Sequence, residues 1–233
     1  MMKVTLPVFA ILALLLQVGP ASADIGECGS DTQTGDICSI PILDVHPTQF
    51  SVGMLEVNEK QAAVEHLSSD KLKRFLKKHT IPTVIGPNHA YFMTDHHHLA
   101  RALLGAGVDH MNLDIQNDYS GLSEQRFWAQ MQSSQLVYLY DENGAGPFLP
   151  SQLPATVARL GDDIYRSLAW AVQKQTGAYA DTNSAYASFL WANFFRTRVP
   201  RTQLNSDFNA AVQAGANWAR SHQAASLPGY LGT

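Results

Sequence analysis

The sequence is poor in cysteine: its 233 residues contain two, Cys28 and Cys38, both in a polar segment close to the start. A catalytic thiolate needs positively charged surroundings, whereas the neighbours Glu27 and Asp31 are acidic. The pair is therefore a poor candidate for a nucleophile. In an exported chain the two cysteines predict one local disulfide, which fixes an N-terminal arm over residues 24–39.

The chain also lacks an excess of basic residues and, beyond its start, a long apolar run. It has 16 lysines and arginines against 20 aspartates and glutamates, a formal net charge of −4 with histidine neutral. Because non-specific binding to nucleic acid depends on neutralising phosphates with Lys and Arg, stable genome binding is not expected. No segment after residue 23 approaches the roughly 18 apolar residues of a spanning helix.

The first 23 residues have the form of a secretory signal peptide. Lys3 supplies a short positive start, an apolar stretch follows it, and an A-x-A cleavage signal ends at Ala23. We therefore expect a secreted or periplasmic protein that is cleaved after Ala23 and carries no membrane anchor.

Hydrophobic periodicity predicts an α/β protein whose last part is helical. Residues 81–86 and 91–94 are expected to pair as a hairpin, and the lysines between residues 71 and 78 are expected to form a solvated helix face. Aromatic residues in the later helices are more often core than binding surface. The expected strands are residues 39–45, 81–86, 91–94 and 108–115; the expected helices are 56–64, 70–79, 120–131, 164–175, 184–198 and 207–222; the expected core aromatics are Trp170, Trp191 and Phe194.

The most informative segment is YFMTDHHHLARAL, residues 91–103, in which three histidines follow an aspartate at a predicted strand-to-helix junction. Asp95 falls near the expected helix N-cap, and we expect the imidazoles of His96, His97 and His98 to face outward beside free backbone N–H groups. Together with the positive end of the helix dipole, this junction is a place to hold an anion, commonly a phosphate.

Two other interpretations of the histidines stay open. Neutral imidazoles are common metal ligands, so His96, His97 and His98 are candidate ligands of a divalent metal. Consecutive helical residues point about 100° apart, so at most two of the three converge on one point and further ligands would come from elsewhere. The third interpretation is a helix start that is merely polar. If His97 has a catalytic or ligand-binding role, replacing it should reduce activity strongly and change folding stability little.

Polar residues of the segment HPTQFSVGMLEVNEK suit the same chemistry. Gln49 lies in a predicted loop, and Glu56 and Lys60 lie one turn apart on a predicted helix. A carboxylate with a lysine suits proton transfer and phosphate binding. A solvated i,i+4 ion pair explains Glu56 and Lys60 equally well.

The segment GDDIYRSLAW, residues 161–170, opens a predicted helix. Asp162 or Asp163 is expected to cap this helix. Arg166, one turn further on, is placed to reach a phosphate or a carboxylate.

These two segments, together with IPTVIGP and YFMTDHHHLARAL, resemble in order the motifs of the ParB-like nuclease family, a branch of the ParB and sulfiredoxin superfamily. The resemblance covers roughly residues 40–198. It implies a small mixed-sheet α/β (α+β) domain over residues 40–140, whose strand-to-helix junction binds nucleotide or phosphate groups. A helical C-terminal subdomain over residues 141–233 follows. The fold so implied places Glu56 and Lys60 beside the histidine junction.

Two activities of the superfamily are not expected. Sulfiredoxin chemistry needs a cysteine at the junction, where this chain has histidines. Partitioning proteins carry a DNA-binding helix-turn-helix after this domain, whereas this acidic chain continues into aromatic-rich helices.

Three functional hypotheses follow. The first is an exported nuclease, phosphodiesterase or phosphoryl-transfer enzyme acting on a phosphate-containing small molecule or nucleic acid, with His97 or His98 as general base or acid. The second is a non-catalytic extracytoplasmic module in which the same site binds a phosphorylated ligand or a divalent metal. The third is a secreted effector or toxin that acts as a nuclease on foreign nucleic acid. The residues assigned to chemistry are Asp95, His96, His97 and His98, and those assigned to substrate binding are Gln49, Glu56, Lys60, Arg101, Asp163 and Arg166.

Overall fold

A computed structural model of the protein describes residues 25–232. The expected signal segment over residues 1–23 and its cleavage site therefore lie outside the described residues. Within residues 25–232, no helix is long and apolar enough to cross a membrane.

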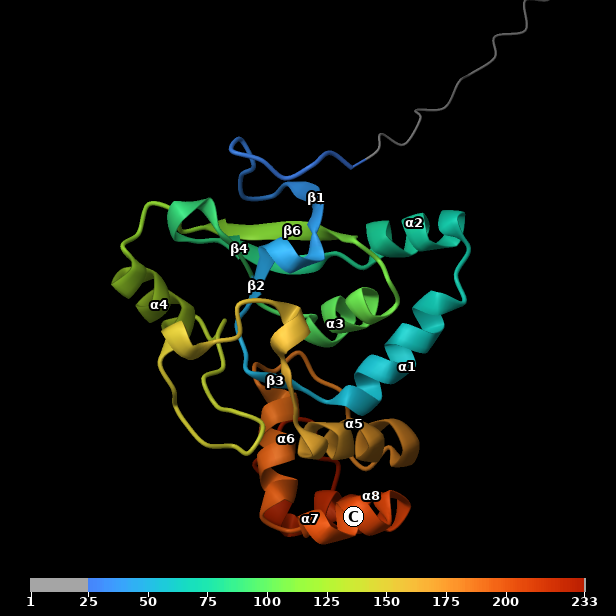
Figure 1. The fold of residues 1–233 in the computed structure, drawn as a ribbon. Helices are drawn as coiled ribbons and strands as arrows, with labels where there is room; N and C mark the ends of the chain where they lie inside the picture. Colours follow the sequence, from blue (N-terminus) through green and yellow to red (C-terminus); the bar gives the residue numbers. More distant parts are fainter. Residues whose placement is uncertain (1–24, 233) are drawn as a thin grey trace, which may run out of the picture.

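A five-stranded mixed sheet forms one end of the molecule (Figure 1). Its strands, in spatial order, are β1 (Ile37–Pro41), β6 (His110–Asp118), β4 (Ile81–Ile85), β5 (Tyr91–Met93) and β2 (Val45–Pro47). β1 pairs with β6, and β4 with β5, in antiparallel fashion, whereas β4–β6 and β2–β5 are parallel. The α/β fold and the predicted hairpin are confirmed.

The expectation of one strand over residues 39–45 is wrong. β1 ends at Pro41, and a 3-10 turn over Ile42–Asp44 separates it from β2. Proline has no N–H to continue a ladder, so the chain leaves the sheet there. β1 and β2 then lie at opposite edges of the sheet.

The predicted helices are present, with shifted ends. A second, two-stranded parallel sheet joins β3 to β7. The helices are α1 (Met54–Glu65), α2 (Ser69–Lys78), α3 (His97–Gly105), α4 (Glu124–Ser133), α5 (Ile164–Thr176), α6 (Ala187–Arg196), α7 (Arg201–Ser206) and α8 (Phe208–Arg220), and the short strands are β3 (Ser51–Val52) and β7 (Gly161–Asp162).

Two main hydrophobic cores hold these elements. One is built from the five-stranded sheet, α1 and α3, and the other from α5, α6 and α8. Figure 1 shows the sheet at one end and the last four helices at the other, with α1 and α3 between them. Trp191 and Phe194 are buried in the helical core, as predicted. Trp170 is only partly buried, so the prediction of a core role for it is wrong.

The start of α1 is fixed against the start of α5. The N–H of Met54 donates to the Asp162 carboxylate at 3.1 Å, and the N–H of Leu55 donates to the Ser167 hydroxyl at 3.2 Å. A Cβ at Gly53 would lie 2.7 Å from the Ser167 nitrogen, so only glycine permits this approach. The two cores therefore meet at α1, β3 and α5.

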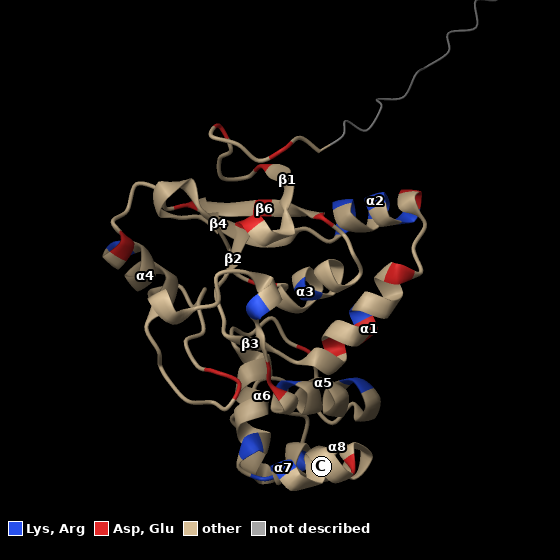
Figure 2. Cartoon of the chain, in the orientation of Figure 1, with Lys and Arg blue, Asp and Glu red and all other residues tan. Residues whose placement is uncertain are grey.

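Several lysine and arginine residues lie along α2 (Figure 2). Its apolar residues Leu72, Phe75 and Leu76 pack partly buried against the sheet core. The cationic side chains are exposed, which confirms the predicted solvated face; they are Lys71, Lys73, Arg74, Lys77 and Lys78.

The N-terminal arm is held by the predicted disulfide between Cys28 and Cys38. Backbone hydrogen bonds at 2.8 Å from Cys28 N–H to the Ser39 carbonyl and from Ser39 N–H to the Gly26 carbonyl fix the arm along β1.

Candidate functional site

A cavity of about 850 Å3 lies where the segment after β2, α1, the start of α3, α5 and the start of α6 meet. The structure brings together in its wall most of the side chains that the sequence singles out. Those lining it are Gln49, Glu56, Lys60, Asp95, His97, His98 and Arg166, whereas His96, Arg101 and Asp163 are not among the lining residues.

His97 is a buried hydrogen-bond acceptor with an exposed fraction of 3%. Its Nε2 accepts the backbone N–H of Thr48 at 3.0 Å. Because an N–H only donates, Nε2 carries no proton, and in the neutral ring the proton lies on Nδ1. Burial, with smaller contributions from Arg166 and His96, lowers the pKa of His97 to about 3. At neutral pH this ring is therefore uncharged, with Nδ1–H as its donor.

His98 is held in the same way. Its Nε2 accepts the backbone N–H of Gly53 at 3.0 Å. Burial, reinforced by Arg166 and other nearby cationic groups, puts the pKa of His98 well below its ordinary value. The Glu56 carboxyl lies 3.5 Å from the same Nε2. An uncharged ring that accepts through Nε2 forms no ion pair with this carboxyl.

Glu56 is a carboxyl whose pKa is raised above its ordinary range. Burial is the main cause and the charge of Asp95 adds to it, while Lys60 and Arg166 act in the opposite direction. Lys60 lies 3.4 Å from Glu56, one turn along α1. Glu56 can therefore exchange a proton at a higher pH than an exposed glutamate, beside two cations.

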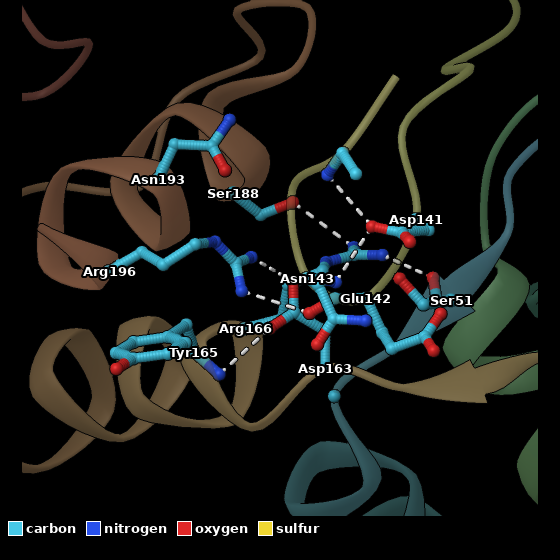
Figure 3. A network of polar contacts seen from close by, with 12 residues as sticks. Ser51, Asp141, Glu142, Asn143, Asp163, Tyr165, Arg166, Ser188, Asn193 and Arg196 are labelled. Carbon is cyan, nitrogen blue, oxygen red and sulfur yellow. Dashed lines mark hydrogen bonds and ion pairs between the residues drawn. The ribbon is translucent and has the colours of Figure 1, made fainter. Parts of the chain in front are cut away.

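Arg166 is a buried cation with an exposed fraction of 5%. It donates to the Ser51 carbonyl at 2.7 Å and to the Ser188 hydroxyl at 3.2 Å (Figure 3). Its guanidinium lies 3.9 Å from the centre of the Phe189 ring. Within residues 25–232 it forms no ion pair. Burial lowers its pKa to about 10, so it is still charged at neutral pH.

The carboxylate of Asp163, three residues before Arg166, has other partners. It caps α5 by accepting the N–H of Tyr165 at 2.9 Å, and it accepts from Arg196 at 2.6 Å (Figure 3). The expected cap is therefore Asp163. Both contacts hold this carboxylate within the protein, and Asp163 is not among the residues that line the cavity.

The expectation that all three imidazoles face outward is wrong for His97 and His98. α3 begins at His97, and the N-cap residue His96 has a left-handed backbone with φ of 60°. Asp95 accepts the N–H of His96 at 2.6 Å, so it does not cap the helix, and among the described residues no side chain does. This turn brings the next two imidazoles under the N–H groups of Thr48 and Gly53, which need acceptors.

Two predicted residues lie apart from the cavity wall. His96 is exposed, and its Nδ1 is 3.0 Å from the Thr80 carbonyl. Arg101 is partly buried on α3, and its Nε lacks a hydrogen-bond partner in the described part of the chain.

The histidines do not fit the metal hypothesis well. Within residues 25–232, no group of three or more His, Cys, Asp and Glu side chains is arranged to hold a metal ion. The Nε2 lone pairs of His97 and His98 already accept backbone N–H groups. Ligation through these nitrogens would break both bonds.

Sequence reasoning missed the part of the wall that α5 contributes beyond Arg166. Trp170, Gln173 and Lys174 line the cavity. Their spacing from Arg166 contains the signal, since residues four, seven and eight positions further along a helix share its face. From the sequence alone, Trp170 is predicted to be a core residue, because aromatic residues of helices are usually buried.

Comparison with known proteins places the chain in a family. A family model described as "Putative ParB-like nuclease" matches residues 38–197. The chain belongs to this family. The matched range begins in β1 and ends just after α6, so all of the residues that line the cavity lie within it except Pro228.

Two solved structures are similar to the chain. Protein Atu1540 from Agrobacterium tumefaciens is 33% identical, with a TM-score of 0.78, and the match covers 84% of this chain and 97% of that one. The chromosome-partitioning protein ParB from Caulobacter crescentus, C-terminally truncated and complexed with CTP-gamma-S, is 13% identical, with a TM-score of 0.28 and coverages of 82% and 96%. No curated protein matches the chain.

Proposed function

We propose that this protein is a phosphodiesterase of nuclease type and that the cavity binds a phosphate group of its substrate. The observation that carries the proposal is the buried guanidinium of Arg166, which lacks a carboxylate partner within residues 25–232. An uncompensated buried charge is costly, and a bound anion offsets that cost. The description of the family as a nuclease agrees with such a ligand.

Other groups of the wall suit the same anion. Lys60 is half-exposed at the cavity, and the two neutral imidazoles carry Nδ1–H donors. The first turn of α3 adds backbone N–H groups that no side chain caps among the described residues. A helix start of this kind favours phosphate.

Glu56 takes the role of proton carrier, because Nε2 of both buried histidines is already occupied. It accepts a proton from the attacking water, whose oxygen forms a bond to phosphorus. The bond from phosphorus to the leaving oxygen breaks, and the proton passes from Glu56 to that oxygen. Arg166 and Lys60 stabilise the charge on the phosphoryl oxygens.

We further propose that the reaction takes place outside the cytoplasm. The support is the signal-peptide form of the first 23 residues.

The test is hydrolysis of bis-p-nitrophenyl phosphate and of single-stranded DNA by the chain from Asp24 onward. Glu56→Gln should reduce the turnover number by about 10²- to 10⁴-fold, the usual contribution of a general acid or base. Because a base must be ionised and the pKa of Glu56 is raised, wild-type activity should fall on the acid side at a pH above 4.5, and Glu56→Gln should lack this limb.

The matched control is Glu59→Gln, an exposed carboxylate on the same helix, which should keep full activity. Inorganic phosphate should raise the melting temperature of the wild type and of Glu56→Gln, but not of Arg166→Gln. Failure of all phosphate compounds and nucleic acids to bind or react would overturn the proposal.

A non-catalytic binding module is the second candidate. The observation in its favour is that neither His97 nor His98 has a free Nε2 with which to accept a proton from an attacking water. A phosphorylated ligand at 100 times its dissociation constant should then add about 2.7 kcal/mol to stability. If a phosphorylated ligand stabilises the wild type and Glu56→Gln equally and neither turns it over, the protein is a non-catalytic binding module.

A further inference from the structure

One face of α5 extends the cavity away from the phosphate-binding corner. Arg166, Trp170, Gln173 and Lys174 all line the cavity. Along this face the side chains pass from buried Arg166 to partly buried Trp170 and exposed Lys174. With about 1.5 Å of rise per residue, the Cα atoms of the two cations lie about 12 Å apart along the helix, with an indole between them.

The Trp170 ring is available for a ligand. Four other aromatic rings of the wall stack in two pairs. The ring centres of Tyr138 and Phe189 lie 3.7 Å apart, and those of Tyr179 and Trp191 lie 3.9 Å apart. In the described part of the chain, Trp170 takes part in no ring contact and its N–H has no hydrogen-bond acceptor. Its contacts are with the edge of the helical core.

Lys174 supplies a second cation toward the mouth of the cavity. It is exposed and forms no ion pair with a described residue. A small phosphate ester bound at Arg166 would not extend as far as Lys174. A ligand that uses both cations has anionic groups at both ends of the face and a flat group between them.

We infer that this face of α5 binds a single-stranded oligonucleotide, with one phosphate at Arg166, a base stacked on Trp170 and a further phosphate near Lys174. The inference rests on the proposed function and specifies its substrate class. A groove of cations with an aromatic platform is the usual means of holding single strands with little sequence preference. A duplex is excluded from this mode because its bases are stacked on one another and cannot also lie on an indole.

The test compares two fluorescein-labelled strands: a phosphorothioate-linked oligothymidylate of eight nucleotides and an abasic deoxyribose-phosphate strand of equal length. Fluorescence anisotropy gives the affinity of each for the mature chain. Trp170→Leu, which keeps apolar volume but removes the ring, should weaken oligothymidylate binding by about 5- to 150-fold and leave the abasic strand unaffected. Trp170→Phe should retain most of the wild-type affinity.

Lys174→Gln should weaken the binding of both strands. It should also reduce the slope of log affinity against log salt concentration by about 0.7, the value for one phosphate contact on a single strand. The matched control is Arg126→Gln, an exposed cation on α4, which should change neither quantity. Equal affinities of the wild type for the two strands, or unchanged oligothymidylate binding in Trp170→Leu, would overturn the inference.

Inorganic phosphate separates this failure from failure of the proposed function. If phosphate still stabilises the wild type through Arg166 while Trp170 has no effect, the inference about α5 is wrong and the phosphate site stands. If neither phosphate nor either strand binds, both are wrong.

Discussion

Burial of the His97 imidazole, which lowers its pKa, affects how the protein responds to acid. His97 has a pKa of about 3 in the folded protein, against an ordinary value of 6.5. The folded state therefore binds fewer protons than the unfolded state between these values. The stability that His97 contributes is present above pH 6.5 and is lost as the pH falls toward 3. Glu56, whose pKa is raised, acts oppositely, since its contribution is lost as the pH rises above 4.5.

His97→Gln should make the protein less sensitive to acid. The glutamine stays neutral, and its side-chain oxygen can accept the Thr48 N–H. Between pH 6.5 and 3, the free energy of unfolding of the wild type should fall by roughly 4 to 5 kcal/mol more than that of the variant. This value follows from the difference between the ordinary pKa of His97 and its pKa in the folded protein. Urea unfolding across this range measures the effect.

The comparison variant is His97→Ala, which leaves the Thr48 N–H unpaired and opens a void. The free energy of unfolding of this variant should be lower by about 2 to 4 kcal/mol at pH 7. A loss of this size is contrary to the expectation that replacing His97 hardly affects folding. Equal acid sensitivity of His97→Gln and the wild type would show that protonation of His97 does not couple to unfolding.

Among the elements, α5 connects the structural and the functional parts. Asp162, just before α5, and Ser167, near its start, fix α1; the cap Asp163 pairs with Arg196, and the first turn places Arg166 at the cavity. One helix start therefore holds both the carboxylate that pairs with Arg196 and the arginine that lines the cavity.

Asp163→Ala should destabilise the protein by about 3 to 5 kcal/mol, because it removes the α5 cap and leaves Arg196 without its carboxylate. Asp163→Asn should cost less, since the amide oxygen can still accept the Tyr165 N–H. Chemical unfolding at pH 7 gives both values.

The neighbouring variant Asp162→Ala is the control, because that carboxylate is exposed and accepts one N–H. It should cost about 1 kcal/mol or less. A similar cost for Asp162→Ala and Asp163→Ala would contradict the structural position of Asp163.

At the scale of the whole molecule, the cavity lies between two cores while the N-terminal arm lies on the far side of the sheet, beside β1 (Figure 1). The sheet core reaches into the later part of the chain, since Val157 and Leu160 belong to it. The arm contributes no residue to the cavity wall among those described.

Replacing Cys28 and Cys38 together with Ala should therefore loosen the arm without affecting the site. The bridge closes a short loop, with a sequence separation of 10, so its loss should cost about 3 kcal/mol or less. Thermal unfolding should show this loss, while the stabilisation by inorganic phosphate should remain. Disappearance of the phosphate effect at a temperature where the variant is folded would show that the arm supports the cavity.

The sequence by itself determined the features that depend on neighbouring residues. Hydrophobic periods located the helices and most strands, the spacing of Cys28 and Cys38 indicated a local bridge, and the start of α5 contained its own cap. Such features arise from interactions within a few turns of chain, so their residues appear together in the sequence.

The tertiary structure alone decided what the polar residues face. His97 and His98 turn inward because the N–H groups of Thr48 and Gly53, 49 and 45 residues earlier, require acceptors. Asp163 pairs with an arginine 33 residues further on, whereas Arg166 donates to the Ser51 carbonyl, 115 residues earlier. Trp170 packs against the edge of the helical core and also lines the cavity, because of how α5 packs. Burial and pairing depend on contacts between distant segments, and these exist only after the chain has folded.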